Sequence, residues 1–312
     1  MDGEHTEDEG AHGGGDRRAE AVRENRRLFA EAAREERPDL ARLCLLIGAE
    51  AELHGDVGEA ADEAALDEKS GERSVDLAQI ELDRLSGQLP YERGRSPAQW
   101  ALALELLLGE ECGFHGAQAD YRWLKSSLLQ SVLERRRGLP ILLSVVWTEV
   151  ARRAGAPVYG VALPGHYVVG FGDPAGDHVL ADPFAGGRIL AGNEVDVLVA
   201  SATGNQGRVP EALLRPASPL ETVLRVLNNI RAWAAARPER SRVQLWALDL
   251  SLLLPHHPAR LRHERARLLV ERGEFTAGAR ELEEYAEVIS AMEPAAADAV
   301  RKEARAARAR LN

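Results

Sequence analysis

The chain has 312 residues, 45% of them hydrophobic, which suits one large or two modest domains with a packed core. Its formal net charge of −11 argues against a nucleic-acid partner, because nucleic-acid-binding proteins carry a basic face. With only Cys44 and Cys112 and no Cys/His cluster at ligand spacing, we expect neither a disulfide framework, a metal nor a cofactor. No export signal or 18-residue apolar run is visible, so we expect a cytoplasmic chain without membrane contact.

The first 37 residues are expected to be a disordered or charged segment outside the core. Residues 1–15 are polar and rich in glycine, so we expect disorder there, followed by a charged helix within residues 17–36. A stronger helical pattern with an N-cap aspartate spans residues 39–51. Ten acidic against two basic residues between positions 49 and 76 indicate an acidic insertion, either a solvated linker or a docking surface for basic partners.

The strongest helix signal lies at residues 140–154. Pro140 suits the first helical position, whereas inside a helix a proline would cost roughly 3 kcal/mol. Apolar residues recur at helical spacing along the segment, and Gly155 ends it. Further helices are expected at residues 75–89, 98–111 and 124–136.

A change of pattern after this helix predicts an antiparallel meander. Three short segments rich in β-branched and aromatic residues are separated by turns that contain glycine and proline. The strands are expected at residues 158–163, 166–171 and 178–182, with a further short strand at residues 188–190.

The loop between the second and third strands predicts which residues meet. If its five residues close symmetrically, Phe171 pairs with Asp177, and counting back places His166 opposite Asp182. Directly opposed Cβ atoms lie about 4.5–5.5 Å apart, close enough for a carboxylate to hold an imidazole N–H. We therefore expect a His166–Asp182 pair, either as a satisfied core histidine or as the centre of a binding or catalytic site.

A helix N-terminus beside a His–Asp pair is the arrangement that activates a nucleophile in hydrolases and amide-transfer enzymes. Two side chains are candidates: Ser144, one turn beyond Pro140, and Cys112. The alternative for Ser144 is a hydrogen bond to a backbone carbonyl of its own helix, and the alternative for Cys112 is burial as a small hydrophobe.

Candidate binding groups lie around the start of the same helix. The run of Arg135, Arg136 and Arg137 either binds an anion or pairs with acidic surface groups. The helix N-terminus at Gly138 and Pro140 has unpaired N–H groups that favour an anion, so we expect a small anionic ligand. Tyr167 is expected in the core or in the wall of the site.

Five segments resemble, in order, motifs of the bacterial SirB-type proteins, in which a transglutaminase-like domain precedes tetratricopeptide-like helices. They are CGFHG, ADY, SVLERRRGLPILLSV, PGHYVV and ADPFAGG, at residues 112–116, 119–121, 131–145, 164–169 and 181–187. The resemblance implies an α+β domain of the papain-like cysteine protease superfamily with a small antiparallel sheet, over residues 38–212. In that superfamily the core helix opens with Gly-x-Cys, and here Pro140 stands where the cysteine would be.

The C-terminal part, residues 216–312, is expected to be an α-helical tetratricopeptide-like domain. Helical segments alternate with short breaks, and a Gly273 turn followed by Phe275 is similar to one tetratricopeptide unit, with Gly278 where that motif prefers alanine. Such helices bind proteins or peptides. Their expected spans are residues 219–236, 241–253, 259–272 and 275–289.

Two hypotheses for the function remain open. The favoured one is a degenerate, non-catalytic scaffold that keeps its His–Asp site and binds a protein or peptide through the helical repeats. The alternative is a hydrolase or amide-transfer enzyme that uses the His166–Asp182 dyad with Ser144, Cys112 or an activated water.

Overall fold

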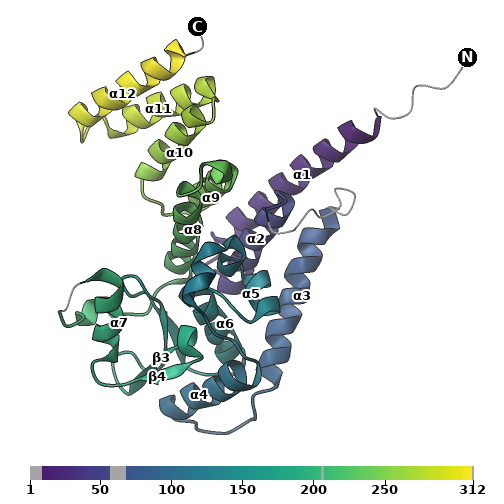
Figure 1. The fold of residues 1–312 in the computed structure, drawn as a ribbon, viewed down its shortest axis with the longest axis vertical. Coiled ribbons are helices and arrows are strands. Elements are labelled where there is room, and N and C mark those ends of the chain that lie inside the picture. Colours follow the sequence, from purple (N-terminus) through teal and green to yellow (C-terminus); the bar gives the residue numbers. More distant parts are fainter. Residues whose placement is uncertain (1–8, 57–67, 205–206, 311–312) are drawn as a thin grey trace, which may run out of the picture. The chain divides into compact units, whose positions relative to one another are not determined.

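The computed structural model describes residues 9–56, 68–204 and 207–310, and it divides into two compact units, Met1–Val226 and Leu227–Asn312. The first unit holds a mostly helical α+β domain with one small sheet (Figure 1). Its α-helices are α1 (Glu9–Ala32), α2 (Leu40–Leu53), α3 (Glu68–Gly87), α4 (Pro97–Leu104), α5 (Leu129–Arg135), α6 (Pro140–Arg153), α7 (Glu194–Thr203) and the first part of α8 (Pro219–Ala235).

The N-terminal segment is more helical than its composition predicts. α1 begins at Glu9, so residues 9–15, where we expected disorder, are helical, while residues 1–8 lie outside the described part. Once a turn has formed, each added residue gains a hydrogen bond, and a helix can therefore extend into a polar stretch. The centre of the acidic segment, residues 57–67, also lies outside the described part.

Two of the expected helices are interrupted. Residues 98–111 form α4 and then a π-helix, Glu105–Glu111, in which a Cβ at Gly109 would lie 1.9 Å from the carbonyl oxygen of Gly186. Residues 124–136 form a 3-10 turn, Leu124–Ser127, and then α5, because Leu128 is extended. The break frees the Ser126 carbonyl to accept a hydrogen bond from the Leu139 N–H, at 2.9 Å.

The central helix α6 agrees with the prediction to within one residue. Pro140 occupies its first position, and Gly155 follows its end with a φ of 85°, which glycine adopts without strain. Eleven of its residues are buried, so α6 is apolar on most sides. It contacts α3 and α5 as well as the first two strands, and therefore forms the centre of the domain.

The sheet is the expected antiparallel meander, with strand order β1-β2-β3-β4. Its strands are β1 (Val158–Val161), β2 (Val168–Gly172), β3 (His178–Asp182) and β4 (Arg188–Leu190). α6 contacts β1 and β2, and α4 contacts β2, β3 and β4. An apolar cluster on the sheet includes Val161, Val168 and Leu180 and extends to Val199 of α7.

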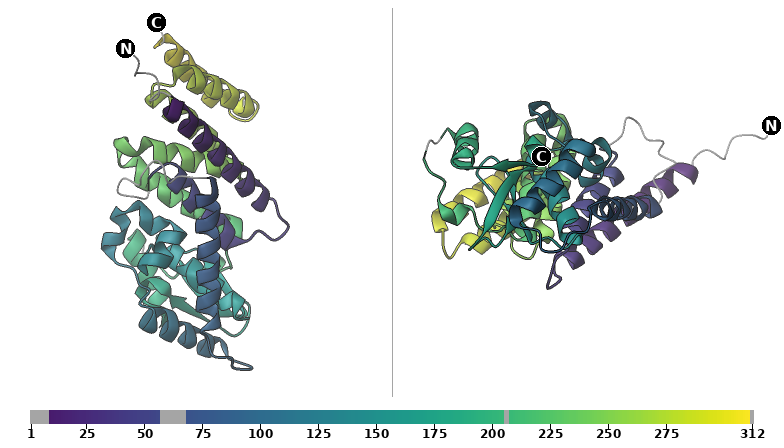
Figure 2. Two further views of the ribbon diagram at one scale, coloured as in Figure 1. Left: turned by 90° about the vertical axis from the view of Figure 1, so that its right-hand side faces the viewer. Right: turned by 90° about the horizontal axis from the view of Figure 1, so that it is seen from below.

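The second unit consists of helices, the later part of α8 and four more: α9 (Ser241–Leu253), α10 (Arg260–Glu271), α11 (Phe275–Ile289) and α12 (Pro294–Ala309). α11 and α12 lie side by side, as the yellow helices in Figures 1 and 2 show, and share an apolar cluster with α10. Gly278 has no room for a side chain, because a Cβ there would lie 2.6 Å from Val270 and 2.8 Å from the Ala266 carbonyl oxygen. This close contact explains why residue 278 is glycine, although the tetratricopeptide motif prefers alanine there.

Among the described residues, no helix is both long enough and apolar enough to cross a membrane.

Candidate functional site

His166 and Asp182 are in contact, as the sequence predicts. The His166 Nε2 and Asp182 Oδ1 atoms lie 2.9 Å apart, and the same oxygen accepts a hydrogen bond from the Phe184 N–H at 3.0 Å. The two side chains are only 10% and 4% exposed, so the carboxylate fixes one ring nitrogen in a nearly dry environment. The other ring nitrogen, Nδ1, has no hydrogen-bond partner in the described part of the chain and is not among its fully buried polar atoms.

The register that we used to predict this contact is wrong by two residues. Phe171 pairs with Val179 rather than with Asp177, and Gly172 pairs with His178. The turn starts one residue later than expected, because the Asp173 carboxylate accepts a hydrogen bond from the Ala175 N–H and fixes the loop. A shift of two residues leaves every side chain on the same face of the sheet, so His166, just before β2, still reaches Asp182 at the end of β3.

Two aromatic rings pack edge-on next to the dyad. The Phe184 ring lies edge-on to the His166 ring at a centroid distance of 5.9 Å, and Tyr121 lies edge-on to Phe184 at 6.3 Å. Tyr121 is 42% exposed, and burial raises the pKa of its hydroxyl, with a further upward contribution from Asp182. We call these four residues, Tyr121, His166, Asp182 and Phe184, the dyad site.

Gly116 leaves room for the ring of Phe184 because it has no side chain. A Cβ at this position would lie 1.9 Å from Phe184 Cδ2, and the Gly116 N–H donates to the Phe184 carbonyl at 3.0 Å. We expect Gly116→Ala to lower the free energy of unfolding by about 1–3 kcal/mol through overpacking. Urea denaturation measures this change. Gly87→Ala, in the last turn of α3 with open space around it, should leave stability unchanged or raise it slightly, and an equal loss in both variants would contradict this packing.

The three arginines before α6 are engaged with carboxylates. Arg135 and Arg137 lie 3.6 and 3.2 Å from the buried Asp120 carboxylate, and Arg136 lies 2.6 Å from Glu81. Asp120 also accepts a hydrogen bond from the Ala117 N–H, so it holds the short 3-10 turn Gln118–Arg122 that carries Tyr121. Of the two roles expected for these arginines, the geometry favours ion pairing, which positions Tyr121.

Neither candidate nucleophile hydrogen-bonds to the dyad. Ser144 is fully buried, and its hydroxyl donates to the Tyr167 carbonyl at 3.3 Å. The charged groups that act on Cys112 are Arg136, Arg84 and two glutamates, and burial raises the pKa of its thiol. Within the described residues, therefore, His166 has no hydroxyl or thiol in hydrogen-bond contact.

The other predicted binding residues are buried at the start of α6 and before β2. A Cβ at Gly138 would lie 2.5 Å from the Val132 side chain, which explains the glycine there, and Pro140 is buried at the first position of α6. Tyr167 is 3% exposed, and its hydroxyl lies 2.8 Å from Thr222 Oγ1. Since burial raises its pKa to about 12, Tyr167 stays protonated near neutral pH and is a packing residue.

Sequence reasoning missed two residues of α8, Thr222 and Arg225. Besides the Thr222–Tyr167 hydrogen bond, the Arg225 Nη2 group donates to the carbonyls of Leu163 and His166, the latter at 2.7 Å. α8 thus holds the loop that carries His166. The capping residues Ser218 and Glu221 mark the start of α8 in the sequence, but no local signal shows what its next turn contacts.

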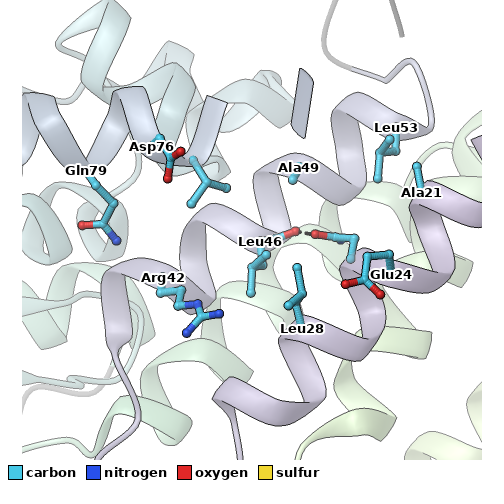
Figure 3. Close-up of a pocket in the computed structure, with 11 residues that line it drawn as sticks. Ala21, Glu24, Leu28, Arg42, Leu46, Ala49, Leu53, Asp76 and Gln79 are labelled. Carbon is cyan, nitrogen blue, oxygen red and sulfur yellow. Dashed lines mark hydrogen bonds between the residues drawn. The ribbon is translucent and has the colours of Figure 1, made fainter. Parts of the chain in front are cut away.

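Three cavities of the first unit lie away from the dyad. The one in Figure 3 has a volume of about 360 Å³ and lies between α1, α2 and α3, lined by apolar side chains that include Leu28 and Leu46 and by charged ones that include Arg42 and Asp76. Neither it nor two further cavities, along α3 and beside α4, is lined by the dyad. In the described residues, no group of three or more His, Cys, Asp or Glu side chains could hold a metal ion.

Comparisons with known families identify the domain that carries the dyad as transglutaminase-like. Residues 76–228 match the transglutaminase-like superfamily, and residues 230–312 match the tetratricopeptide repeat. The chain therefore has the domain composition of the SirB-type proteins and is related to the bacterial UPF0162 proteins.

Two of these relatives show the extent of the similarity. The chain is 36% identical over 166 residues to a UPF0162 protein of Xylella fastidiosa, and the matched region covers 51% of this chain and 58% of that protein. It is 37% identical over 115 residues to one of Pseudomonas aeruginosa, which covers 37% and 41% of the two chains. A solved structure of menin superposes with a TM-score of 0.40 at 12% identity, over 85% of this chain and 69% of menin, a likeness from which we infer nothing.

Proposed function

We propose that this chain is a non-catalytic binding protein, in which a transglutaminase-like domain retains its His–Asp pair but has lost its nucleophile. The observation that carries the proposal is that His166 has no hydrogen bond to a hydroxyl or thiol of the described residues, while Pro140 opens the helix on which the superfamily places its cysteine. Covalent acyl transfer needs a nucleophile held beside its base, so the dyad alone supports recognition rather than turnover.

The tetratricopeptide-like helices supply the second part of the proposal. Their similarity to a repeat that binds proteins and peptides makes a protein or peptide the preferred partner of residues 230–312. We also propose that the boundary between the two domains lies between residues 212 and 216.

A second candidate function, hydrolysis by a water molecule that His166 activates, is favoured by one observation. Nδ1 of His166 has no hydrogen-bond partner among the residues that the structure describes and is not fully buried, so in the neutral ring it can accept a proton from water.

Activity assays on the full chain separate the two candidates. We expect no incorporation of a fluorescent amine into a glutamine-bearing protein, and hydrolysis of p-nitrophenyl acetate at the same rate for wild type and His166→Ala. The matched control is His178→Ala, which removes an exposed histidine of the same sheet. Turnover that His166→Ala abolishes and His178→Ala preserves would contradict the proposal, and additional sensitivity to Cys112→Ser or Ser144→Ala would identify the nucleophile.

A further inference from the structure

Arg225 is a half-buried cation beside the dyad without an ion-pair partner in the described part of the chain. Its guanidinium lies over the Tyr167 ring, 5.7 Å from the centroid, and burial lowers its pKa against smaller upward contributions from Tyr167 and Tyr121. The arginines of the run before α6, by contrast, all lie near carboxylates. A buried cation without a counter-ion is costly, and a bound anion would offset that cost.

The hydrogen-bonding capacity of Arg225 is only partly used. Its Nη2 group donates to the Leu163 and His166 carbonyls, and the remaining N–H groups, on Nε and Nη1, have no partner in the described residues and are not fully buried. A guanidinium presents five N–H donors in a planar fork that matches a carboxylate. One group of the fork is therefore held by the protein, and the others remain for a ligand.

The surroundings of Arg225 indicate which anion fits. The His166 carbonyl accepts a hydrogen bond from its guanidinium, and burial raises the pKa of the Tyr121 hydroxyl, as Asp182 does, whereas Arg225 lowers it. The Tyr121 side chain is partly exposed and packs edge-on to Phe184. Among the charged side chains described at this site, the Arg225 guanidinium is the one without an oppositely charged partner, because His166 and Asp182 pair with each other. A single negative charge matches it, whereas a phosphate dianion would leave a charge uncompensated beside Asp182.

We propose that Arg225, together with Tyr121 and His166, binds a monocarboxylate attached to an apolar group, such as a small aromatic acid or the C-terminus of a peptide. Arg225 receives the carboxylate and Tyr121 packs against the apolar group. The inference rests on the proposed function insofar as the dyad site binds a ligand without converting it.

Two probes of the same size, one with a terminal carboxylate and one with a neutral carboxamide, test this proposal: N-acetylphenylalanine and its amide, titrated calorimetrically into the full chain. We expect the acid to bind about 10- to 100-fold more tightly, the effect of one charge-assisted hydrogen-bonded pair. Arg225→Gln should bring the ratio of the two affinities close to one, and Arg225→Lys should keep part of it. Arg42→Gln, the same change at the distant cavity of Figure 3, should leave the ratio unchanged. A decapeptide ending in phenylalanine that binds more tightly than the small acid would identify a peptide C-terminus as the natural source of the carboxylate, and equal affinity a small acid.

Equal affinities for the two probes in wild type, no binding of either, or an unchanged ratio in Arg225→Gln would overturn the inference. If Arg225→Gln does not fold, NMR spectra of the wild type provide the test. The acid should then shift the ring signals of His166, and the amide should not. Conversion of the amide into the acid would contradict the proposed non-catalytic function and leave the acid preference intact, so the two failures are distinguishable.

Discussion

Trp147→Ala is expected to lower the free energy of unfolding by about 3–5 kcal/mol, the usual cost of removing a large buried aromatic side chain. Trp147 lies on α6 and is fully buried. Its ring packs edge-on against Phe114 at 6.0 Å, and a Cβ at Gly187 would lie 3.0 Å from its Nε1 atom. Trp147 therefore supports the turn that follows Asp182, so its loss should also loosen the dyad site.

Trp147→Phe is the matched control. The Trp147 Nε1 group is buried without a hydrogen-bond partner in the described residues, and an unsatisfied buried donor costs about 1–3 kcal/mol. Phenylalanine removes that donor and keeps most of the ring, so the two effects should nearly cancel. Urea denaturation of both variants measures the difference. A similar loss of unfolding free energy in both would contradict this account, because it would show that ring packing alone does not explain the role of Trp147.

The central helix and the strands were predictable because their signals are local. Pro140 and Gly155 mark the two ends of α6 in the sequence, and β3 and β4 have the predicted bounds. β1 ends two residues earlier than predicted and β2 begins two residues later, so His166 lies in the loop before β2. The transglutaminase-like and tetratricopeptide-like domains were recognisable for the same reason, since their motifs are short and occur in a fixed order. The resemblance to these two families is confirmed.

The dyad shows how a correct contact can follow from a wrong register. The loop length was correct, but the Asp173 side chain fixes the turn one residue later than a symmetric closure would. Because the alternation of side chains has a period of two, the resulting shift of two residues preserved the face, and His166 still meets Asp182. A shift of one residue would have separated them.

The partners of the charged residues could not be predicted, because they depend on contacts far apart in the sequence. Arg225 reaches the His166 carbonyl across 59 residues, and Arg136 reaches Glu81 across 55. A run of three arginines is typical of an anion site, yet all three lie near carboxylates, whereas Arg225 in the amphipathic helix α8 has no ion-pair partner among the described residues. Charge patterns in a sequence do not show which charges are neutralised in the fold.

The second large effect is expected from Pro140→Cys, which restores a thiol to the position where the superfamily carries its nucleophile. A thiol at a helix N-terminus beside a histidine has its pKa lowered to about 3.5–7.5, because the helix dipole and the imidazolium stabilise the thiolate. Ser144, one turn further along α6, contacts the Tyr167 carbonyl, so the first turn of α6 lies beside the segment that carries His166. The introduced thiol should therefore titrate well below the ordinary value of about 8.5.

The two native thiols do not obscure this measurement. Burial raises the pKa of both Cys44 and Cys112, so neither forms a thiolate near neutral pH. Pro294→Cys, at the start of α12, controls for the effect of a helix N-terminus that lacks the dyad.

Ultraviolet thiolate absorbance of Pro140→Cys as a function of pH is the most direct test of the claim that the site is intact except for its nucleophile. We predict a midpoint below about 7.5 that rises when His166→Ala is added. For Pro294→Cys we predict a midpoint closer to the ordinary thiol value, because only the helix dipole acts there. A midpoint at or above that ordinary value for Pro140→Cys, unchanged by His166→Ala, would contradict the account, because the start of α6 would then not face the dyad.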